Sequence, residues 1–112
     1  MSGDVGGKRL DQLVEVLFDK TARLDERDDA AVHLGRVDDP RALQALVDRA
    51  SDPREDDAVV GSAGESIAAI WLRRGNYDPR ILEGLRREPR AEIEALISQQ
   101  RPEWLAGRDS TA

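Results

Sequence analysis

The sequence predicts an all-α fold: a short α-solenoid of antiparallel helix pairs, with about six helices in all. A helix-start motif occurs twice, apolar residues recur at helical spacing along the chain, and no stretch alternates apolar and polar residues as a strand does. Because one helix pair buries its apolar side only against another pair, such pairs are expected to stack side by side.

The repeated motif marks the start of two equivalent helices. Residues 39–46 (DPRALQAL) return as residues 78–85 (DPRILEGL), at a spacing of 39 residues. In both copies an aspartate is placed to cap the helix, and a proline occupies the first helical position, where its missing N–H breaks no hydrogen bond. Leucines follow four and seven residues after each aspartate, which predicts one apolar side for each helix.

Two helices are expected before the first copy of the motif, over residues 8–20 and 25–37. In the first, apolar residues stand at i, i+3, i+4, i+7 and i+8, which is typical of a helix with one apolar side. These residues are Leu10, Leu13, Val14, Leu17 and Phe18. In the second, acidic residues fill the first turn and favour the positive end of the helix dipole. Its apolar residues are Ala30, Ala31, Leu34 and Val37.

Four further helices are predicted, beginning near residues 40, 58, 79 and 89. Gly61 and Gly64 lie inside the longest of these helices. Because glycine weakens a helix interior by about 1 kcal/mol relative to alanine, we expect a kink or break near these two residues. Trp104 is expected to fold back on the core and close the domain.

Residues 8–105 are expected to form a single domain, with residues 1–7 as a flexible lead-in and residues 106–112 as a flexible tail. No apolar run approaches the roughly 20 residues that cross a bilayer, and the first residues lack the pattern of a signal peptide. We therefore expect a cytoplasmic protein that does not contact a membrane. The chain has no cysteine, which excludes disulfides and thiolate metal sites.

Acidic residues concentrate in the middle of the chain. The net charge is −6, and residues 25–66 hold twelve acids against five bases. Such a surface disfavours nucleic acid, whose phosphates bind cations, and predicts a protein partner with a basic surface. The same acids are equally consistent with a solvated loop that only keeps the domain in solution. The candidate partner-binding residues are Asp52, Glu55, Asp56, Asp57, Glu65 and Tyr77.

The residue patterns of enzymes, metal sites and cofactor sites do not occur in this sequence. His33 is the only histidine, and no metal ligand stands three or four residues after it. Asp39 and Asp78 are assigned to helix caps rather than to acid–base catalysis. Residues 52–57 lack the ligand spacing of a calcium loop. We therefore expect a non-enzymatic protein with neither a metal nor a cofactor.

Two neighbouring patterns resemble a known repeat family. AAxxLG at residues 30–35, followed by DDPRALxxL at residues 38–46, resembles a HEAT-like repeat, especially the short bacterial kind of phycobilisome-lyase-type repeats. The second unit is less similar, since IAAIWL at residues 67–72 stands in the place of AAxxLG. The resemblance covers residues 27–86, and it implies helix pairs stacked into a solenoid with the first and last helices as caps.

A second resemblance concerns the whole chain. GESIAAIW at residues 64–71 and RPEW at residues 101–104 resemble small bacterial HEAT-like proteins that act as immunity proteins beside polymorphic or contact-dependent toxins. This resemblance implies a protein that neutralises a cognate toxin by covering a basic active site with an acidic face. The alternative is a HEAT-repeat scaffold or lyase-accessory protein that holds a different protein or a small ligand. The oligomeric state is left open by the sequence.

Overall fold

The computed structural model describes the backbone of residues 2–109 and the side chains of residues 9–106. Within these residues the chain forms helices and no strand, which confirms the all-α prediction. The helices are α1 (Ser2–Phe18), α2 (Leu24–Leu34), α3 (Pro40–Ser51), α4 (Asp57–Arg74), α5 (Pro79–Gly84), α6 (Arg87–Gln100) and α7 (Glu103–Asp109). None of these described helices is sufficiently long and apolar to cross a bilayer.

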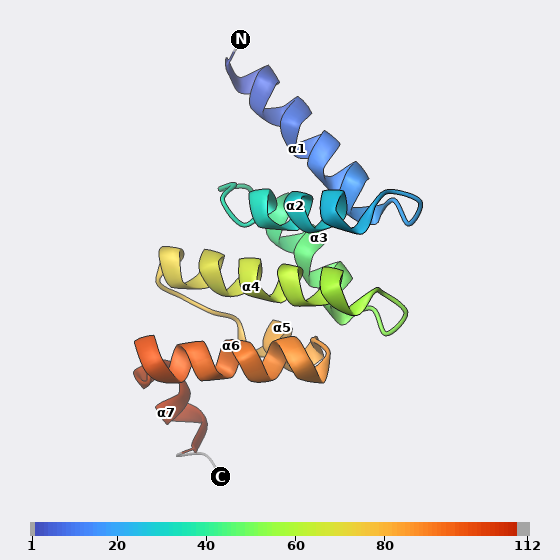
Figure 1. Cartoon of the computed structure of the whole chain (residues 1–112). Coiled ribbons are helices and arrows are strands. Elements are labelled where there is room, and N and C mark those ends of the chain that lie inside the picture. Colours follow the sequence, from blue (N-terminus) through green and yellow to red (C-terminus); the bar gives the residue numbers. More distant parts are fainter. Residues whose placement is uncertain (1, 110–112) are drawn as a thin grey trace.

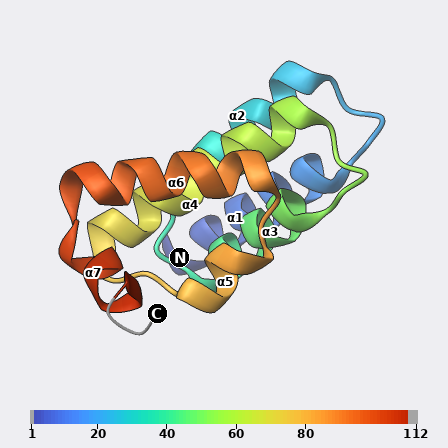
Figure 2. The ribbon, with the colours of Figure 1, turned by 90° about the horizontal axis from the view of Figure 1, so that it is seen from below.

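The helices form two layers in an elongated molecule that measures 46 × 34 × 19 Å. Helices α2, α4 and α6 run parallel to one another and lie side by side in one layer (Figure 1). Helix α3 packs antiparallel against α4 from the other layer, α1 pairs with α2, and the short α5 lies beneath α6 (Figure 2). Because α4 contacts α2, α3 and α6, it is the central helix of the molecule.

The two copies of the Asp-Pro motif start helices in the same way, as expected. The side chain of Asp39 accepts a hydrogen bond from the backbone N–H of Arg41 at 2.9 Å, and Asp78 accepts one from Arg80 at 2.9 Å. The second helix, α5, nevertheless ends after six residues, whereas α3 has twelve. After Gly84 the chain turns extended, and the N–H of Arg86 bonds to the carbonyl of Ala50 at 3.0 Å. Helix α5, which begins at the second copy of the motif, therefore ends early, where the chain bonds to the C-terminal end of α3.

Helix α4 is continuous, so the expected kink near Gly61 and Gly64 is wrong. Gly64 serves packing instead: a Cβ at this position would lie 2.6 Å from the Cβ of Pro89, on α6. Gly35 plays the same part between α2 and α4, where a Cβ would lie 2.6 Å from Oγ of Ser66. At Gly61 a Cβ would meet nothing within 4 Å. Gly35 and Gly64 therefore allow three parallel helices to approach closely. Helix α4 stays continuous although glycine has a low helix propensity.

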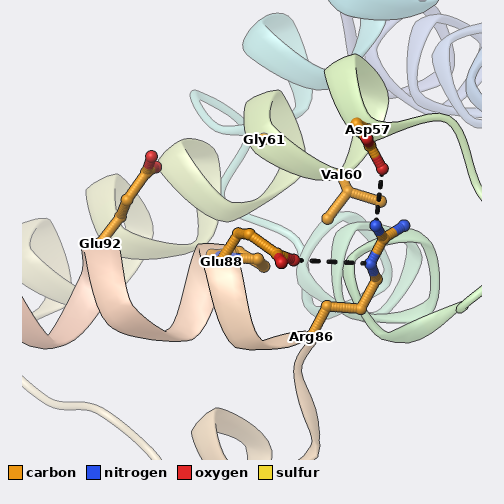
Figure 3. Close-up of a pocket in the computed structure, with 7 residues that line it drawn as sticks. Asp57, Val60, Gly61, Arg86, Glu88 and Glu92 are labelled. Atoms are coloured by element: carbon orange, nitrogen blue, oxygen red, sulfur yellow. Dashed lines mark hydrogen bonds and ion pairs between the residues drawn. The ribbon is translucent and has the colours of Figure 1, made fainter.

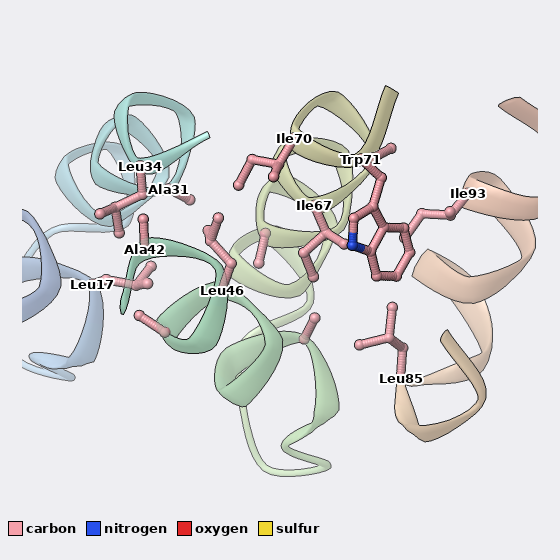
Figure 4. Packing of buried hydrophobic residues seen from close by; sticks show 14 of the residues in the cluster. Leu17, Ala31, Leu34, Ala42, Leu46, Ile67, Ile70, Trp71, Leu85 and Ile93 are labelled. Atoms are coloured by element: carbon pink, nitrogen blue, oxygen red, sulfur yellow. The ribbon is translucent and has the colours of Figure 1, made fainter. Parts of the chain in front are cut away.

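The core is a continuous row of buried side chains between the two layers (Figure 4). Its largest fully buried members include Leu17, Leu34, Leu46, Ile67, Ile70, Leu82, Ile93 and Ile97. They come from every helix between α1 and α6, and the central α4 is buried against α2, α3 and α6. The apolar spacing in the sequence identified the sides that face the core, although Leu13, Val14, Phe18 and Val37 are only partly buried against it.

The boundaries at the two ends of the domain differ from the expectation. Helix α1 begins at Ser2, so helical backbone covers residues that were expected to precede the first helix. Helix α7 extends to Asp109, into the expected tail, while Met1 and residues 110–112 lie outside the described residues. Trp104 does fold back: its ring stacks on Tyr77 at 5.3 Å between centroids, and the Tyr77 hydroxyl donates to its carbonyl at 2.9 Å.

The two glycines of α4 give opposite predictions when each is changed to alanine. Gly64→Ala should lower the free energy of unfolding by about 1–3 kcal/mol, because the new methyl group must displace Pro89. Gly61→Ala should raise it by up to about 1 kcal/mol, because the new methyl group meets nothing and the helix propensity improves. Urea unfolding followed by circular dichroism measures both. Effects of the same sign would contradict this account of α4.

Candidate partner-binding site

Glu55 was expected on the acidic surface, and the structure corrects this prediction. The residue is only 4% exposed. Its Oε2 accepts hydrogen bonds from Nη2 of Arg27 at 2.9 Å and from Nη1 of Arg49 at 2.6 Å. Its Oε1 accepts one from the backbone N–H of Asp56 at 3.0 Å. A carboxylate that is enclosed by two arginines holds the fold together and is not free to meet a partner.

The two arginines tie this buried site to the helices around it. Arg27 comes from α2, and its Nε and Nη2 also donate to the carbonyl of Leu17, at the end of α1. Arg49 comes from α3 and lies over the ring of Phe18, with 4.3 Å between its Cζ and the ring centroid. Sequence reasoning missed both residues. Their positions in the sequence could have indicated their burial. Each arginine stands three or four residues from a buried alanine, and therefore on the apolar side of its own helix.

The environment of Glu55 changes its pKa. Burial alone would raise the pKa of this carboxyl group, because the charged form loses its water. The hydrogen bonds from Arg27, from the N–H of Asp56 and from Arg49 favour the charged form more strongly, and they lower the pKa of Glu55 to about 2. Glu55 is therefore ionised throughout the physiological range.

The remaining acids of the segment 52–57 reach the surface, although each also has a local role. Asp52 accepts a hydrogen bond from the backbone of Arg54 at 2.8 Å, and Asp56 caps α4 by accepting one from Ala58 at 2.8 Å. Asp57 pairs with Arg86 at 2.6 Å, yet 92% of its side chain is exposed. These three acids can face a partner while they keep their structural contacts.

Glu65 and Tyr77 do not join the acids of the segment 52–57. Glu65 is exposed two turns further along α4, at the rim of a shallow depression between α2 and α4. Tyr77 follows the opposite end of α4, whose 18 residues span about 27 Å, and it packs between Trp71 and Trp104. Tyr77 therefore anchors the C-terminal helix to the core and does not lie beside an acidic surface.

The structure brings other acids to the segment instead. Because α2, α4 and α6 run parallel, their N-terminal ends lie at the same edge of the layer, at the right of Figure 1. We call this surface the acidic edge. It consists of the exposed or half-buried residues Asp25, Glu26, Asp28, Asp29, Asp52, Asp56, Asp57 and Glu88. The C-terminal ends of the same helices carry arginines at the opposite edge. These are Arg36, Arg73, Arg74 and Arg101.

Acidic residues of α2 and α6 were absent from the sequence-based set of site residues, although a signal for them existed. Each N-terminal turn holds acids that favour the positive end of a helix dipole. Once the helices are parallel, these local preferences add up to one charged edge. The sequence pattern indicated the acids, but the direction of stacking was needed to group them.

His33 and the carboxylates do not form a metal centre in the part of the chain that the structure describes. No group of three or more histidine, aspartate and glutamate side chains is arranged there to hold a metal ion. Nδ1 of His33 lies 2.8 Å from the carbonyl of Asp29, one turn earlier in α2, and this contact accounts for one of its ring nitrogens.

Comparisons of the chain with protein-family models, with curated proteins and with solved structures gave no match. A function is therefore inferred from the geometry and charges of this chain and from the resemblances of its sequence motifs.

Removing the buried carboxylate should destabilise the protein strongly. We expect Glu55→Ala to lower the free energy of unfolding by about 3–5 kcal/mol, because it leaves the buried guanidinium of Arg27 without a carboxylate partner and removes one of the three carboxylates that pair with Arg49. The matched control is Glu65→Ala on the exposed side of α4, with an effect within about 0.5 kcal/mol. Denaturant unfolding at pH 7 measures both. Equal effects of the two substitutions would show that the buried ion pairs contribute nothing.

The lowered pKa of Glu55 also predicts a pH dependence. Because the folded-state pKa of about 2 lies below the ordinary value of 4.5, the stabilisation is complete above about pH 4.5 and is lost as the pH falls towards 2. Glu55→Gln removes this titration. The difference in unfolding free energy between the natural protein and this variant should therefore shrink between pH 5 and pH 2. A difference that stays constant over this range would contradict the assigned ionisation.

Proposed function

We propose that this chain is a non-enzymatic protein-binding module whose acidic edge docks on the basic surface of a partner protein. One observation carries the proposal: the eight exposed or half-buried carboxylates of the acidic edge outnumber the four exposed or half-buried arginines of the same region, Arg23, Arg54, Arg86 and Arg87. A charge distribution of this kind orients a charged partner before contact.

Local helix stability accounts for only part of this acidic edge. Asp56 and Asp57 are used in a cap and an ion pair. Glu26 and Asp29 are exposed, and neither side chain forms an ion pair with another described residue. Such carboxylates keep their charge available for a partner. They therefore supply long-range attraction, which raises the association rate more than it lowers the dissociation rate.

Within this class we favour an immunity protein that covers the basic active site of a cognate toxin. The support is the resemblance of residues 64–71 and 101–104 to small bacterial HEAT-like immunity proteins, together with the acidic edge. Substrate mimicry or simple occlusion would both follow from the placement of carboxylates against catalytic cations. We also propose that the helix pairs form a HEAT-like solenoid, on the basis of the repeated Asp-Pro caps and the parallel layer of α2, α4 and α6.

Charge reversal at the acidic edge should slow the binding of the partner. The partner is first captured from the cells of origin by cross-linking and identified by mass spectrometry. We expect the double variant Glu26→Lys, Asp29→Lys to lower the association rate constant by about tenfold or more at low ionic strength. Stopped-flow measurements at several salt concentrations should also give a weaker salt dependence for this variant.

The control changes the same net charge elsewhere. Asp38→Lys, Glu103→Lys places its substitutions after the C-terminal end of α2 and on α7, at the opposite edge and at two exposed residues. Its association rate should stay within about twofold of the natural protein, because screening limits the reach of each charge to about 10 Å in 0.1 M salt. The proposal fails if the two double variants slow binding equally, or if the captured partner presents no basic surface. If the partner is a toxin, the natural chain should also abolish its activity.

A depression between α3 and α5 favours the alternative of a scaffold that holds a small ligand. It has a volume of about 330 Å³, within the range of ligand pockets, and its lining combines the apolar and aromatic Leu43, Trp71, Tyr77 and Ile81 with the polar Arg74, Asn76 and Asp78. Ligands that occupy it should raise the melting temperature of the natural protein and quench its tryptophan fluorescence. Leu43→Glu should remove both effects. If no ligand that combines apolar and polar groups shifts the melting temperature, the alternative is wrong.

A further inference from the structure

A groove lies between α4 and α6, beside the acidic edge (Figure 3). Its volume is about 220 Å³, below the 300 Å³ or more that is typical of pockets for drug-sized ligands, so it suits one inserted side chain. The floor is formed by Val60, Gly61 and the ring of Pro89. Carboxylates line the rim, and they belong to Asp57, Glu88 and Glu92.

The groove has more negative charge than its own residues neutralise. Among the described residues that line the groove, Arg86 is the only cation, and its guanidinium donates to Asp57 at 2.6 Å and lies 4.0 Å from Glu88. Glu92 forms no ion pair with another described residue. Glu88 and Glu92 stand four residues apart on α6, where like charges repel. A second cation between these two glutamates would relieve that repulsion.

Gly61 on the floor adds a steric observation to the electrostatic one. Gly35 and Gly64 are explained within the fold, because a Cβ at either position would collide with Ser66 or Pro89. At Gly61 a Cβ would meet nothing within 4 Å, although the residue lies in a helix interior where glycine costs about 1 kcal/mol. No described side chain uses the space left above Gly61. This space would instead admit a group from another molecule.

We propose that this groove receives an arginine side chain from the basic partner protein. The methylene groups of the arginine lie on Val60, Gly61 and Pro89, and its guanidinium bridges the carboxylates of Glu88 and Glu92. This inference rests on the proposed function and assigns to it one anchoring contact. The same charges that attract the partner over a distance then hold one of its side chains in a shaped site.

Arginine fits this groove better than lysine does. A guanidinium presents five donors in a plane, so it can bond two carboxylates at once, whereas an ammonium is a compact point charge. The guanidinium is also more weakly hydrated, which lowers the cost of leaving water over an apolar floor. Charge-assisted bonds of this type are roughly twice as strong as neutral hydrogen bonds.

The test uses two small probes on the intact chain, N-acetyl-arginine-N-methylamide and its lysine counterpart. Titration is followed by the backbone amide signals in ¹H–¹⁵N NMR spectra. We expect the arginine probe to shift amides in two segments, residues 57–61 and 86–92, and to bind more tightly than the lysine probe. Equal binding of the two probes would overturn the assignment to arginine. Shifts spread evenly over all exposed acids, or no shifts, would overturn the site.

Variants separate the groove from general acidity. Glu92→Gln should weaken the arginine probe by about 2- to 5-fold, the effect of one exposed ion pair. Gly61→Leu should abolish its binding by filling the groove, and circular dichroism verifies that the variant is folded. Glu65→Gln removes an equal charge from the other side of α4 and should leave the affinity unchanged. If Glu65→Gln weakens the probe as much as Glu92→Gln does, the groove has no special role.

The full partner distinguishes a failure of this inference from a failure of the proposed function. If the partner binds Gly61→Leu as tightly as the natural protein, while the reversal of Glu26 and Asp29 still slows its association, only the groove is wrong. If the arginine probe binds at the groove but no basic protein partner is captured, the proposed function is wrong and the site stands as a cation site.

Discussion

The buried carboxylate of Glu55 is the interaction on which the arrangement of the helices depends. It lies in the short connection between α3 and α4, where it accepts hydrogen bonds from Arg27 on α2 and Arg49 on α3. Arg27 reaches onward to the carbonyl of Leu17, at the end of α1. An unpaired buried charge costs several kcal/mol, and Arg27 forms an ion pair with Glu55 but with no other described residue, so the two side chains depend on each other. Three helices and a loop are therefore held in one relative position.

This arrangement also decides where the surface charge lies. Arg86 extends the contacts to α6 through the carbonyl of Glu55 and the carboxylate of Asp57. Because α2, α4 and α6 are parallel, the positive ends of their three helix dipoles lie at one edge. The acidic residues at that edge stabilise each helix, and together they give the surface a negative charge. The acidic edge and the groove beside it are thus consequences of the stacking direction. Helix stability and the proposed recognition of a partner use the same carboxylates.

The helices and their caps could be predicted because they depend on neighbours in the sequence. The spacing of apolar residues identified the buried sides, and the capping roles of Asp39 and Asp78 followed from the proline after each. The continuity of α4 could not be predicted in this way. The low helix propensity of glycine predicted a break at Gly64. The close packing of Pro89 against this glycine outweighs the free-energy cost of glycine in the helix.

The candidate site residues also divide into those that depend on sequence neighbours and those that depend on tertiary packing. The sequence by itself determined an all-α chain, two capped helix starts, an excess of acid in its middle and the exposed positions of Asp56 and Asp57. Only the tertiary structure decided that Glu55 is buried, that Tyr77 belongs to the C-terminal packing, and that acids of α2 and α6 join one edge. The physical reason is distance along the chain. Caps and apolar sides form within one or two turns, whereas a buried ion pair or a shared edge requires residues that only the packing of whole helices brings together.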